Sequence, residues 1–229
     1  MIIDDLNRAP TGHYGTILID APWCFATYSA KGCGRSPDAH FDPMSIEALR
    51  VLPIQHIAKA DAVLFCWAVS WMLPGAIDMM ERWGFPCVST GFVWVKTMKS
   101  DPRRLRHGLG FTTRKACEVC LLGRRGHPKR LNKDVSEIIM APRGLPMQKP
   151  VEQYDRIERL YAGPYIEMFA RRTRPGWDSW GNEVGLLDNG AVRTRRIPSG
   201  RAPQVRVGPG GGVTNQTSPV AATKSPTVV

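Results

Sequence analysis

The sequence has no apolar run that approaches the roughly 18 residues of a membrane-spanning helix. Its first residues, Met1-Ile2-Ile3-Asp4-Asp5, carry no positive charge where a signal peptide needs it, so we do not expect secretion. Acidic residues are also scarce, because 20 Asp and Glu stand against 31 Lys and Arg, for a net charge of +11. These shortages predict a cytoplasmic protein with no membrane span and favour an anionic partner, such as nucleic acid or a membrane surface.

Cysteine is present but forms no complete pattern of a disulfide framework or a metal site. Four of the six cysteines lie in or beside apolar runs, which predicts reduced thiols packed in a core: Cys66, Cys87, Cys117 and Cys120. Cys117 and Cys120 have the spacing of half a zinc site. No second pair follows them at a ligand distance, so we predict no bound metal.

Aromatic residues are missing from the last part of the chain. Residues 185–229 contain six basic residues and one acid, with many Gly, Pro, Ser and Thr. Such a segment cannot build a core, so the composition predicts a folded domain over residues 1–184 and a disordered basic tail over residues 185–229. The charges of this tail are either simply solvated or a non-specific grip on phosphates.

Apolar runs of strand length alternate with amphipathic stretches between residues 15 and 184. Strands are expected at 16–19, 62–67, 91–95, 116–122, 135–140 and 165–169. Helices are expected at 71–83, with Gly84 as C-cap, and at 151–160. This alternation predicts an α/β fold with a mostly parallel sheet flanked by helices. Ligands of such sheets bind beyond the carboxyl ends of the strands, which directs attention to three long polar loops: 24–44, 96–114 and 123–134.

The turn Asp20-Ala21-Pro22-Trp23 follows the first of these strands. The exocyclic amine of a nucleobase is a poor nucleophile, because its lone pair is delocalised into the ring. The Asp20 carboxylate and the Ala21 carbonyl could accept its two N–H groups and draw the lone pair out of conjugation, while Trp23 stacks on the base. The alternative is an ordinary turn after a strand, with a surface aromatic.

This turn resembles the Asp-Pro-Pro-Trp motif of the MT-A70 family of S-adenosylmethionine-dependent adenine N6-methyltransferases. Ala21 departs from the family's proline but keeps the backbone carbonyl that the role needs. Seven further blocks resemble the family in the same order, and the resemblance covers about residues 15–184. These blocks lie at 40–45, 63–67, 94–97, 114–126, 149–160, 166–171 and 176–183.

The resemblance implies a Rossmann-like methyltransferase fold with a permuted order of motifs, in which the catalytic turn comes early and the main cofactor strand late. It also implies that four residues hold S-adenosylmethionine: Lys149, Arg171, Asn182 and Glu183. Lys149 would pair with the methionine carboxylate, and Asn182 and Glu183 suit the ribose hydroxyls. The short chain, without long extensions, looks like a prokaryotic or phage version of the family.

Basic residues concentrate in two of the long loops. The loop at 96–114 supplies four of the predicted substrate-binding residues, and His40 in the loop at 24–44 is the fifth. These residues are His40, Lys96, Arg103, Arg104 and Arg106. A second cluster occupies residues 124–133, and we expect the two loops to flank the site as a track for a nucleic-acid backbone. The alternatives are solvated charged surfaces and a structural role for His40.

The predicted function is therefore transfer of a methyl group from S-adenosylmethionine to N6 of adenine in DNA, with Asp20 to Trp23 as the catalytic turn. The reaction needs neither a metal nor a covalent enzyme intermediate. Three alternatives stay open: an RNA adenine N6-methyltransferase, a non-catalytic nucleic-acid-binding subunit, and methylation of cytosine N4. Asp20 argues against the non-catalytic subunit, because such members of the family have lost this acid.

Overall fold

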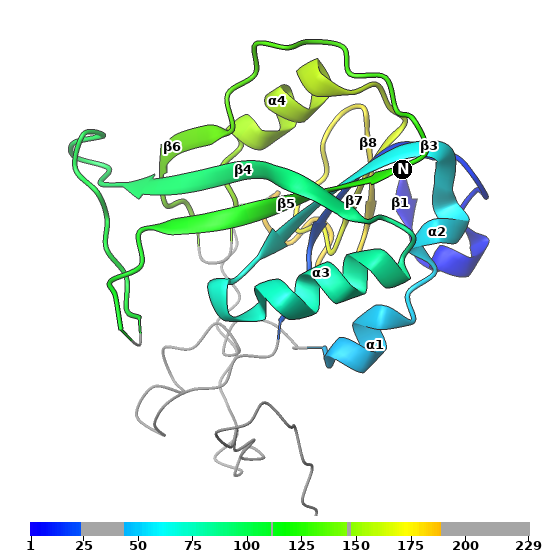
Figure 1. Ribbon diagram of the computed structural model, residues 1–229, viewed down its shortest axis with the longest axis horizontal. Helices are drawn as coiled ribbons and strands as arrows, with labels where there is room; N and C mark the ends of the chain where they lie inside the picture. Colours follow the sequence, from blue (N-terminus) through cyan, green and yellow to red (C-terminus); the bar gives the residue numbers. More distant parts are fainter. Residues whose placement is uncertain (24–43, 111, 146–147, 189–229) are drawn as a thin grey trace, which may run out of the picture. The chain divides into compact units, whose positions relative to one another are not determined.

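The computed structural model describes residues 1–23, 44–110, 112–145 and 148–188 (Figure 1). These residues form an eight-stranded sheet in the order β1-β8-β7-β2-β3-β5-β4-β6. Every neighbouring pair is parallel except the two that involve β5. The predicted α/β class with a mostly parallel sheet is thus confirmed. The strands are β1 (Ile2–Ile3), β2 (Tyr14–Asp20), β3 (Ala58–Ala68), β4 (Cys87–Thr97), β5 (Cys117–Arg125), β6 (Ile138–Pro142), β7 (Tyr165–Met168) and β8 (Trp177–Trp180).

Helices cover both faces of the sheet. On one face lie α1, α2 and α3, and on the other lies α4 (Figure 1). None of the helices in the described ranges is long and apolar enough to cross a membrane. The helices are α1 (Ile46–Arg50), α2 (Ile54–Ile57), α3 (Leu73–Arg82) and α4 (Glu152–Leu160), with 3-10 turns η1 (Leu6–Arg8) and η4 (Ser70–Met72).

Strand β3 explains why one apolar run serves two cores. Successive side chains of a strand point to opposite faces of the sheet. Leu64 and Cys66 accordingly pack on the α3 side, whereas Phe65 and Trp67 pack on the α4 side. Both faces are covered, so the strand is apolar at consecutive positions and does not alternate with polar residues.

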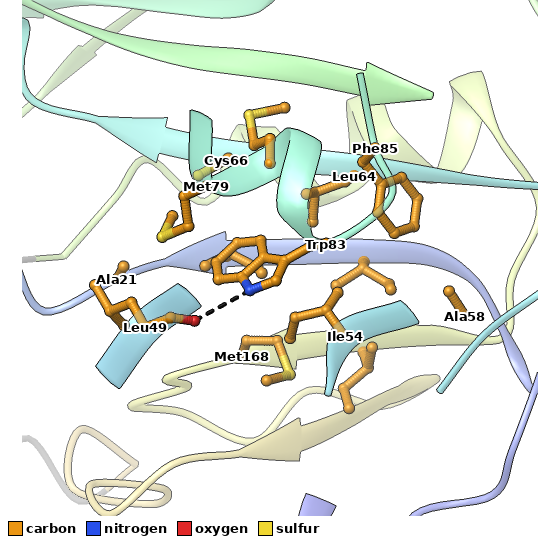
Figure 2. Packing of buried hydrophobic residues seen from close by; sticks show 14 of the residues in the cluster. Ala21, Leu49, Ile54, Ala58, Leu64, Cys66, Met79, Trp83, Phe85 and Met168 are labelled. Carbon is orange, nitrogen blue, oxygen red and sulfur yellow. Dashed lines mark hydrogen bonds between the residues drawn. The ribbon is translucent and has the colours of Figure 1, made fainter. Parts of the chain in front are cut away.

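The core on the α3 side centres on Trp83, which directly follows α3 (Figure 2). Its indole N–H donates to the Leu49 carbonyl at 3.0 Å, which ties α3 to α1. Gly84 follows with φ +77°, a conformation that favours glycine, and so confirms the expected end of this helix.

The direction of β5 decides which residues meet at each edge of the sheet. Because β5 is antiparallel, it begins where its neighbours end, and Cys117 pairs with Val95 near the end of β4. At its other end, Arg125 pairs with Ala62 early in β3. We call the edge at which the parallel strands end the carboxyl edge, and the opposite one the amino edge.

The folded chain continues past the boundary at residue 184 that the composition suggested. Leu187 is buried, and its N–H donates to the Arg171 carbonyl at 2.9 Å. Residues 189–229 lie outside the described residues, so the disordered basic tail stays a prediction.

The four cysteines described are free thiols, as expected, but they do not all lie in the core. Cys66 and Cys120 are buried, and burial raises the pKa of both thiols. Cys87 is half-buried, and Cys117 is exposed, which corrects the prediction of a core thiol there. Cys117 and Cys120 are three residues apart on a strand, so their side chains point to opposite faces and cannot share a metal ion.

Candidate functional site

The predicted catalytic turn lies at the carboxyl edge, where β2 ends between β7 and β3. The Trp23 N–H donates to the Ala21 carbonyl at 2.9 Å, and the Met44 N–H donates to the Pro22 carbonyl at 2.9 Å. These bonds fix the turn immediately after Asp20. Carbonyl oxygens have two lone pairs, so Ala21 keeps one acceptor position for a ligand.

The ring of Trp23 has a different environment from the one that the sequence suggested. It is only 3% exposed, and its indole N–H donates to the Trp67 carbonyl at 3.2 Å. A ring in this position anchors the turn to the end of β3. It does not present a face on which a base could stack in this structure.

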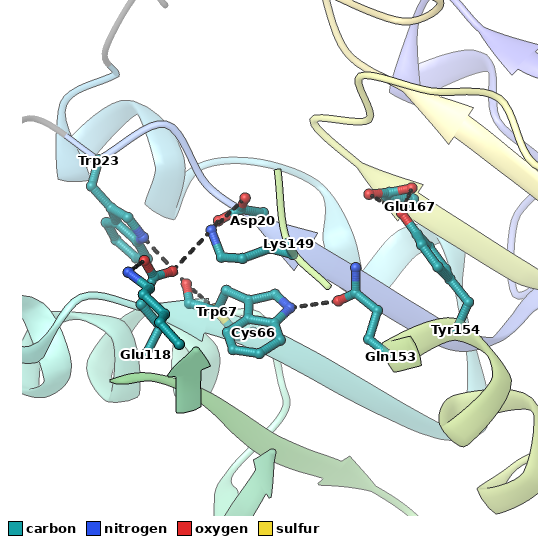
Figure 3. A network of polar contacts seen from close by, with 10 residues as sticks. Asp20, Trp23, Cys66, Trp67, Glu118, Lys149, Gln153, Tyr154 and Glu167 are labelled. Atoms are coloured by element: carbon teal, nitrogen blue, oxygen red, sulfur yellow. Dashed lines mark hydrogen bonds and ion pairs between the residues drawn. The ribbon is translucent and has the colours of Figure 1, made fainter. Parts of the chain in front are cut away.

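Lys149 lies between two carboxylates at the carboxyl edge (Figure 3). Its ammonium nitrogen donates to both oxygens of Asp20 at 2.7 Å and lies 3.4 Å from one oxygen of Glu118. Lys96 in turn donates to the other oxygen of Glu118. Two cations and two anions therefore alternate in the order Lys96, Glu118, Lys149, Asp20, and the charges of this row balance.

The pKa values of this row follow from burial and from the alternation. Burial raises the pKa of Asp20, and the Lys149 ammonium opposes that rise. Burial alone would also raise the pKa of Glu118, but Lys149 and Lys96 outweigh it and lower the pKa to about 2. For Lys149, burial favours the neutral amine, yet the two carboxylates raise its pKa above the ordinary value. Lys149 is therefore a permanent cation at the site.

A second group of buried polar residues supports the row from the α4 side (Figure 3). The indole N–H of Trp67 donates to the Gln153 side-chain oxygen at 2.6 Å, and Lys149 lies 5.7 Å from the centre of the Trp67 ring. The Tyr154 hydroxyl donates to the Glu167 carboxylate at 2.9 Å. Burial raises the pKa of Glu167 to about 7, with a further contribution from the charge of Asp20.

The other three predicted cofactor residues lie where β7 and β8 end. Arg171 pairs with Glu183 at 2.8 Å, and Asn182 is exposed beside this pair. Gly181 has φ +149°, and a Cβ there would lie 2.9 Å from the Cα of Phe169, so only glycine allows the two strand ends to approach this closely. The charge of Arg171 also acts on Asp20, the carboxylate that holds Lys149.

This edge offers the chemical groups that S-adenosylmethionine needs. The cations Lys149 and Arg171 can pair with a carboxylate, and the side chains of Asn182 and Glu183 can bond ribose hydroxyls. The residues therefore fit the cofactor, although each individual assignment stays a prediction.

Three of the predicted substrate-binding residues are exposed in the loop that projects beyond β4 and β5 (Figure 1). The loop is braced because Met98 N–H donates to the Arg104 carbonyl at 2.9 Å and Arg106 N–H donates to the Lys96 carbonyl at 2.8 Å. Lys96 itself is not a surface cation, because it is paired with Glu118. His40 lies outside the described residues. The exposed three are Arg103, Arg104 and Arg106.

The second basic cluster does not flank the site, and this part of the sequence prediction is wrong. Arg124 and Arg125 pair with Val63 and Ala62 early in β3, at the amino edge. Asp20 pairs with Trp67 near the opposite end of the same strand. The antiparallel direction of β5 causes the difference, because it carries the end of that strand away from the catalytic turn.

Sequence reasoning missed the roles of four residues: Trp67, Glu118, Gln153 and Glu167. Two of them could have been recognised, since Glu118 stands beside the apolar run 119–122 and Glu167 stands between apolar residues of β7. A charge in a covered strand needs a buried partner, which marks a polar site. Gln153 gave no such signal, because a glutamine on an amphipathic helix is ordinary.

Comparison with known proteins matches the MT-A70 family to residues 14–183. The Type II methyltransferase M.MunI of Mycoplasma sp is 26% identical over 195 residues, which cover 77% of this chain and 80% of that protein. The N(6)-adenosine-methyltransferase MT-A70-like protein of Drosophila melanogaster is 28% identical over 209 residues, 85% of this chain and 32% of that protein. The N(6)-adenine-specific methyltransferase METTL4 of Mus musculus is 28% identical over 188 residues, 75% of this chain and 37% of that protein.

Proposed function

The chain belongs to the MT-A70 family of S-adenosylmethionine-dependent adenine N6-methyltransferases, and from this premise we propose that it methylates adenine in DNA. One observation carries the choice of DNA. The match with the Type II methyltransferase covers about four fifths of both proteins. Relatives named for N(6)-adenosine or for N6-methyladenosine in RNA share between 24% and 52% of their length with this chain.

The catalytic step follows from two acceptors at the end of β2. The Asp20 carboxylate and the Ala21 carbonyl accept the two N–H groups of the adenine amine, so that its lone pair points away from the ring system. S-adenosylmethionine supplies, when bound, a methyl group on a cationic sulfur. The methyl group would pass directly to N6 as its bond to sulfur breaks, and the proton that N6 then loses would go to the Asp20 carboxylate. Fixed acceptors and correct alignment of the amine provide most of the acceleration.

Asp20 can accept the amine while it stays paired with Lys149. Each of its oxygens accepts one bond from Lys149 and keeps a further lone pair for an N–H group of the amine. Glu118, at 3.4 Å from Lys149, is a second anionic partner of the ammonium. We assign to Lys149 the role of pairing with the methionine carboxylate.

The remaining assignments complete the site. Arg171, Asn182 and Glu183 hold the cofactor at the ends of β7 and β8. The exposed arginines of the loop beyond β4 contact phosphates and place the acceptor strand. An adenine in a duplex must leave the base stack to reach Asp20, at a cost of a few kcal/mol.

A methyl-transfer assay with radiolabelled S-adenosylmethionine tests the choice of acceptor. DNA and RNA of matched sequence are offered separately to the full chain, and label is expected in N6 of adenine of the DNA. Label in RNA alone would overturn the DNA assignment. Calorimetry on the same sample distinguishes the non-catalytic subunit, which would bind nucleic acid without binding the methyl donor.

A further inference from the structure

The basic cluster at the amino edge is left without a role by the proposed catalytic site. It lies at the end of β5 and in the segment that follows, and we call residues 126–134 the distal loop. Five Lys or Arg residues and no acid occur between 123 and 133: Arg124, Arg125, Lys129, Arg130 and Lys133. This density of one sign needs an explanation, because like charges that are close together repel.

The backbone of the distal loop is held at several points. The His127 N–H donates to Asp61 at 2.8 Å, and the Leu131 N–H donates to the Leu160 carbonyl, the last residue of α4, at 2.8 Å. The side chain of Asn132 donates to the Arg159 carbonyl at 2.7 Å. Figure 1 shows the same segment running along α4 between β5 and β6. The loop is therefore ordered by the helix end that it covers.

The cations of the distal loop take no part in this bonding. Lys129, Arg130 and Lys133 are exposed, and none of them forms an ion pair with a carboxylate of the described residues. The single acid of the loop, Asp134, is paired with Arg159 at 2.8 Å. An ordered backbone with free cations loses little entropy on binding, which is what a preformed phosphate site requires.

The register of the sheet gives the level of Arg125, which directly precedes the distal loop, relative to Asp20. Asp20 pairs with Trp67 and Arg125 pairs with Ala62, so five residues of β3 separate the two levels. At about 3.3 Å per residue this is about 17 Å along the strand. A duplex rises 3.4 Å per base pair, so one that runs along the strand direction must extend about five base pairs or more beyond the target to reach the loop.

We propose that the distal loop is a second, sequence-independent contact for the nucleic-acid backbone, which grips the acceptor at a distance from the target adenine. The proposal rests on a nucleic-acid acceptor and holds for DNA or RNA. The loop holds the flank of a long acceptor through phosphates, whereas the loop beyond β4 acts at the target itself.

The test compares acceptors of two lengths and one double variant, Lys129→Gln/Arg130→Gln. The short duplex has about 8 bp centred on the target adenine and is measured in the cold, and the long one has about 40 bp. The affinity of the full chain for each duplex is measured at several salt concentrations. The side chains of Lys129 and Arg130 are exposed and form no ion pair in the described residues, so their replacement should leave the fold unaffected. Arg8→Gln, a change of one charge at an exposed arginine near the N-terminus, is the control for loss of charge elsewhere and is compared with each single variant, Lys129→Gln and Arg130→Gln.

On the long duplex, the slope of log Kd against log salt concentration should fall by about two for the double variant, because two phosphate contacts are lost. On the short duplex the slope should stay unchanged, and Arg8→Gln should change neither. Equal changes on both lengths, or no change on either, would overturn the proposal. Both lengths are also prepared as RNA, and methylation of each polymer is measured. Methylation of RNA alone would overturn the choice of DNA, and it would leave the test of the distal loop intact.

Discussion

Lys149 donates hydrogen bonds to both carboxylate oxygens of Asp20, at 2.7 Å each, and so fixes the carboxylate that the acceptor amine must reach. A carboxylate removed from water without such a partner would be costly to keep ionised. The site therefore keeps Asp20 ionised by pairing it with a cation of the protein, and the remaining lone pairs of its oxygens are left for the amine.

Replacing Asp20 by Ala should abolish methyl transfer, by about 100-fold or more, because the acceptor for the amine N–H is removed. The affinity for S-adenosylmethionine should change little, because Lys149 keeps Glu118 as its partner. Transfer rates and calorimetric cofactor affinity measured on one preparation check both statements. Transfer near the parent rate would contradict the assigned mechanism.

Lys149→Met should move the acid limb of the pH profile of kcat/KM upward. Asp20 accepts the amine as a carboxylate, burial raises its pKa, and Lys149 is the largest influence that lowers it. Without Lys149 the pKa rises further, so the ionised form, and with it activity, appears only at higher pH. Lys96→Met is the matched control, because Lys96 acts on Glu118. An unshifted limb in Lys149→Met would show that the lysine does not tune Asp20.

Glu167 should make the protein less stable as the pH rises from about 4.5 to about 7. Its folded pKa is raised to about 7 from the ordinary 4.5, so the folded state binds the proton more tightly than the unfolded state in this window. This contribution to stability is complete below the unfolded pKa and is lost as the pH passes the folded one. Urea unfolding of the parent and of Glu167→Gln across this range measures it, and parallel curves for the two proteins would refute the assignment.

Gln153→Ala should lower the free energy of unfolding by about 1–3 kcal/mol, because it leaves the buried indole N–H of Trp67 without its acceptor. Trp67→Phe removes the donor, so adding Gln153→Ala to that variant should cost less than it does in the parent. Urea denaturation of the two single variants and the double variant gives the coupling. Additive effects would mean that the 2.6 Å hydrogen bond contributes nothing.

The catalytic turn could be predicted because its chemistry is local. Asp20 and Ala21 are consecutive residues, and a short strand followed by an acid and a proline indicates the end of a strand without any knowledge of the rest of the chain. Lys149 could be identified as a site residue only by its resemblance to the family. Its pairing with Asp20 could not be predicted from the sequence. Lys149 lies 129 residues from Asp20, and only the packing of the segment at the start of α4 against the sheet brings the two together.

Trp23 shows that the type of a residue does not always predict its role. Stacking and anchoring both favour an aromatic residue after the turn, so the residue type cannot distinguish a ring that faces a ligand from one that faces the core. The hydrogen bond to the Trp67 carbonyl decides for the core. The same applies to Cys117, which begins a largely apolar stretch although its own side chain is exposed.

By itself, the sequence predicted six of the eight strands, the two longer helices, the turn after β2 and the family, because these depend on side-chain periodicity and on residues adjacent in the chain. The short strands β1 and β8 were not predicted, because two to four residues carry too little pattern. Only the tertiary structure decided the direction of β5. A strand covered on both faces has the same apolar character in either direction, so its residues do not show which end lies at the site. That direction places Glu118 beside Lys149 and sends Arg124 and Arg125 to the opposite edge of the sheet.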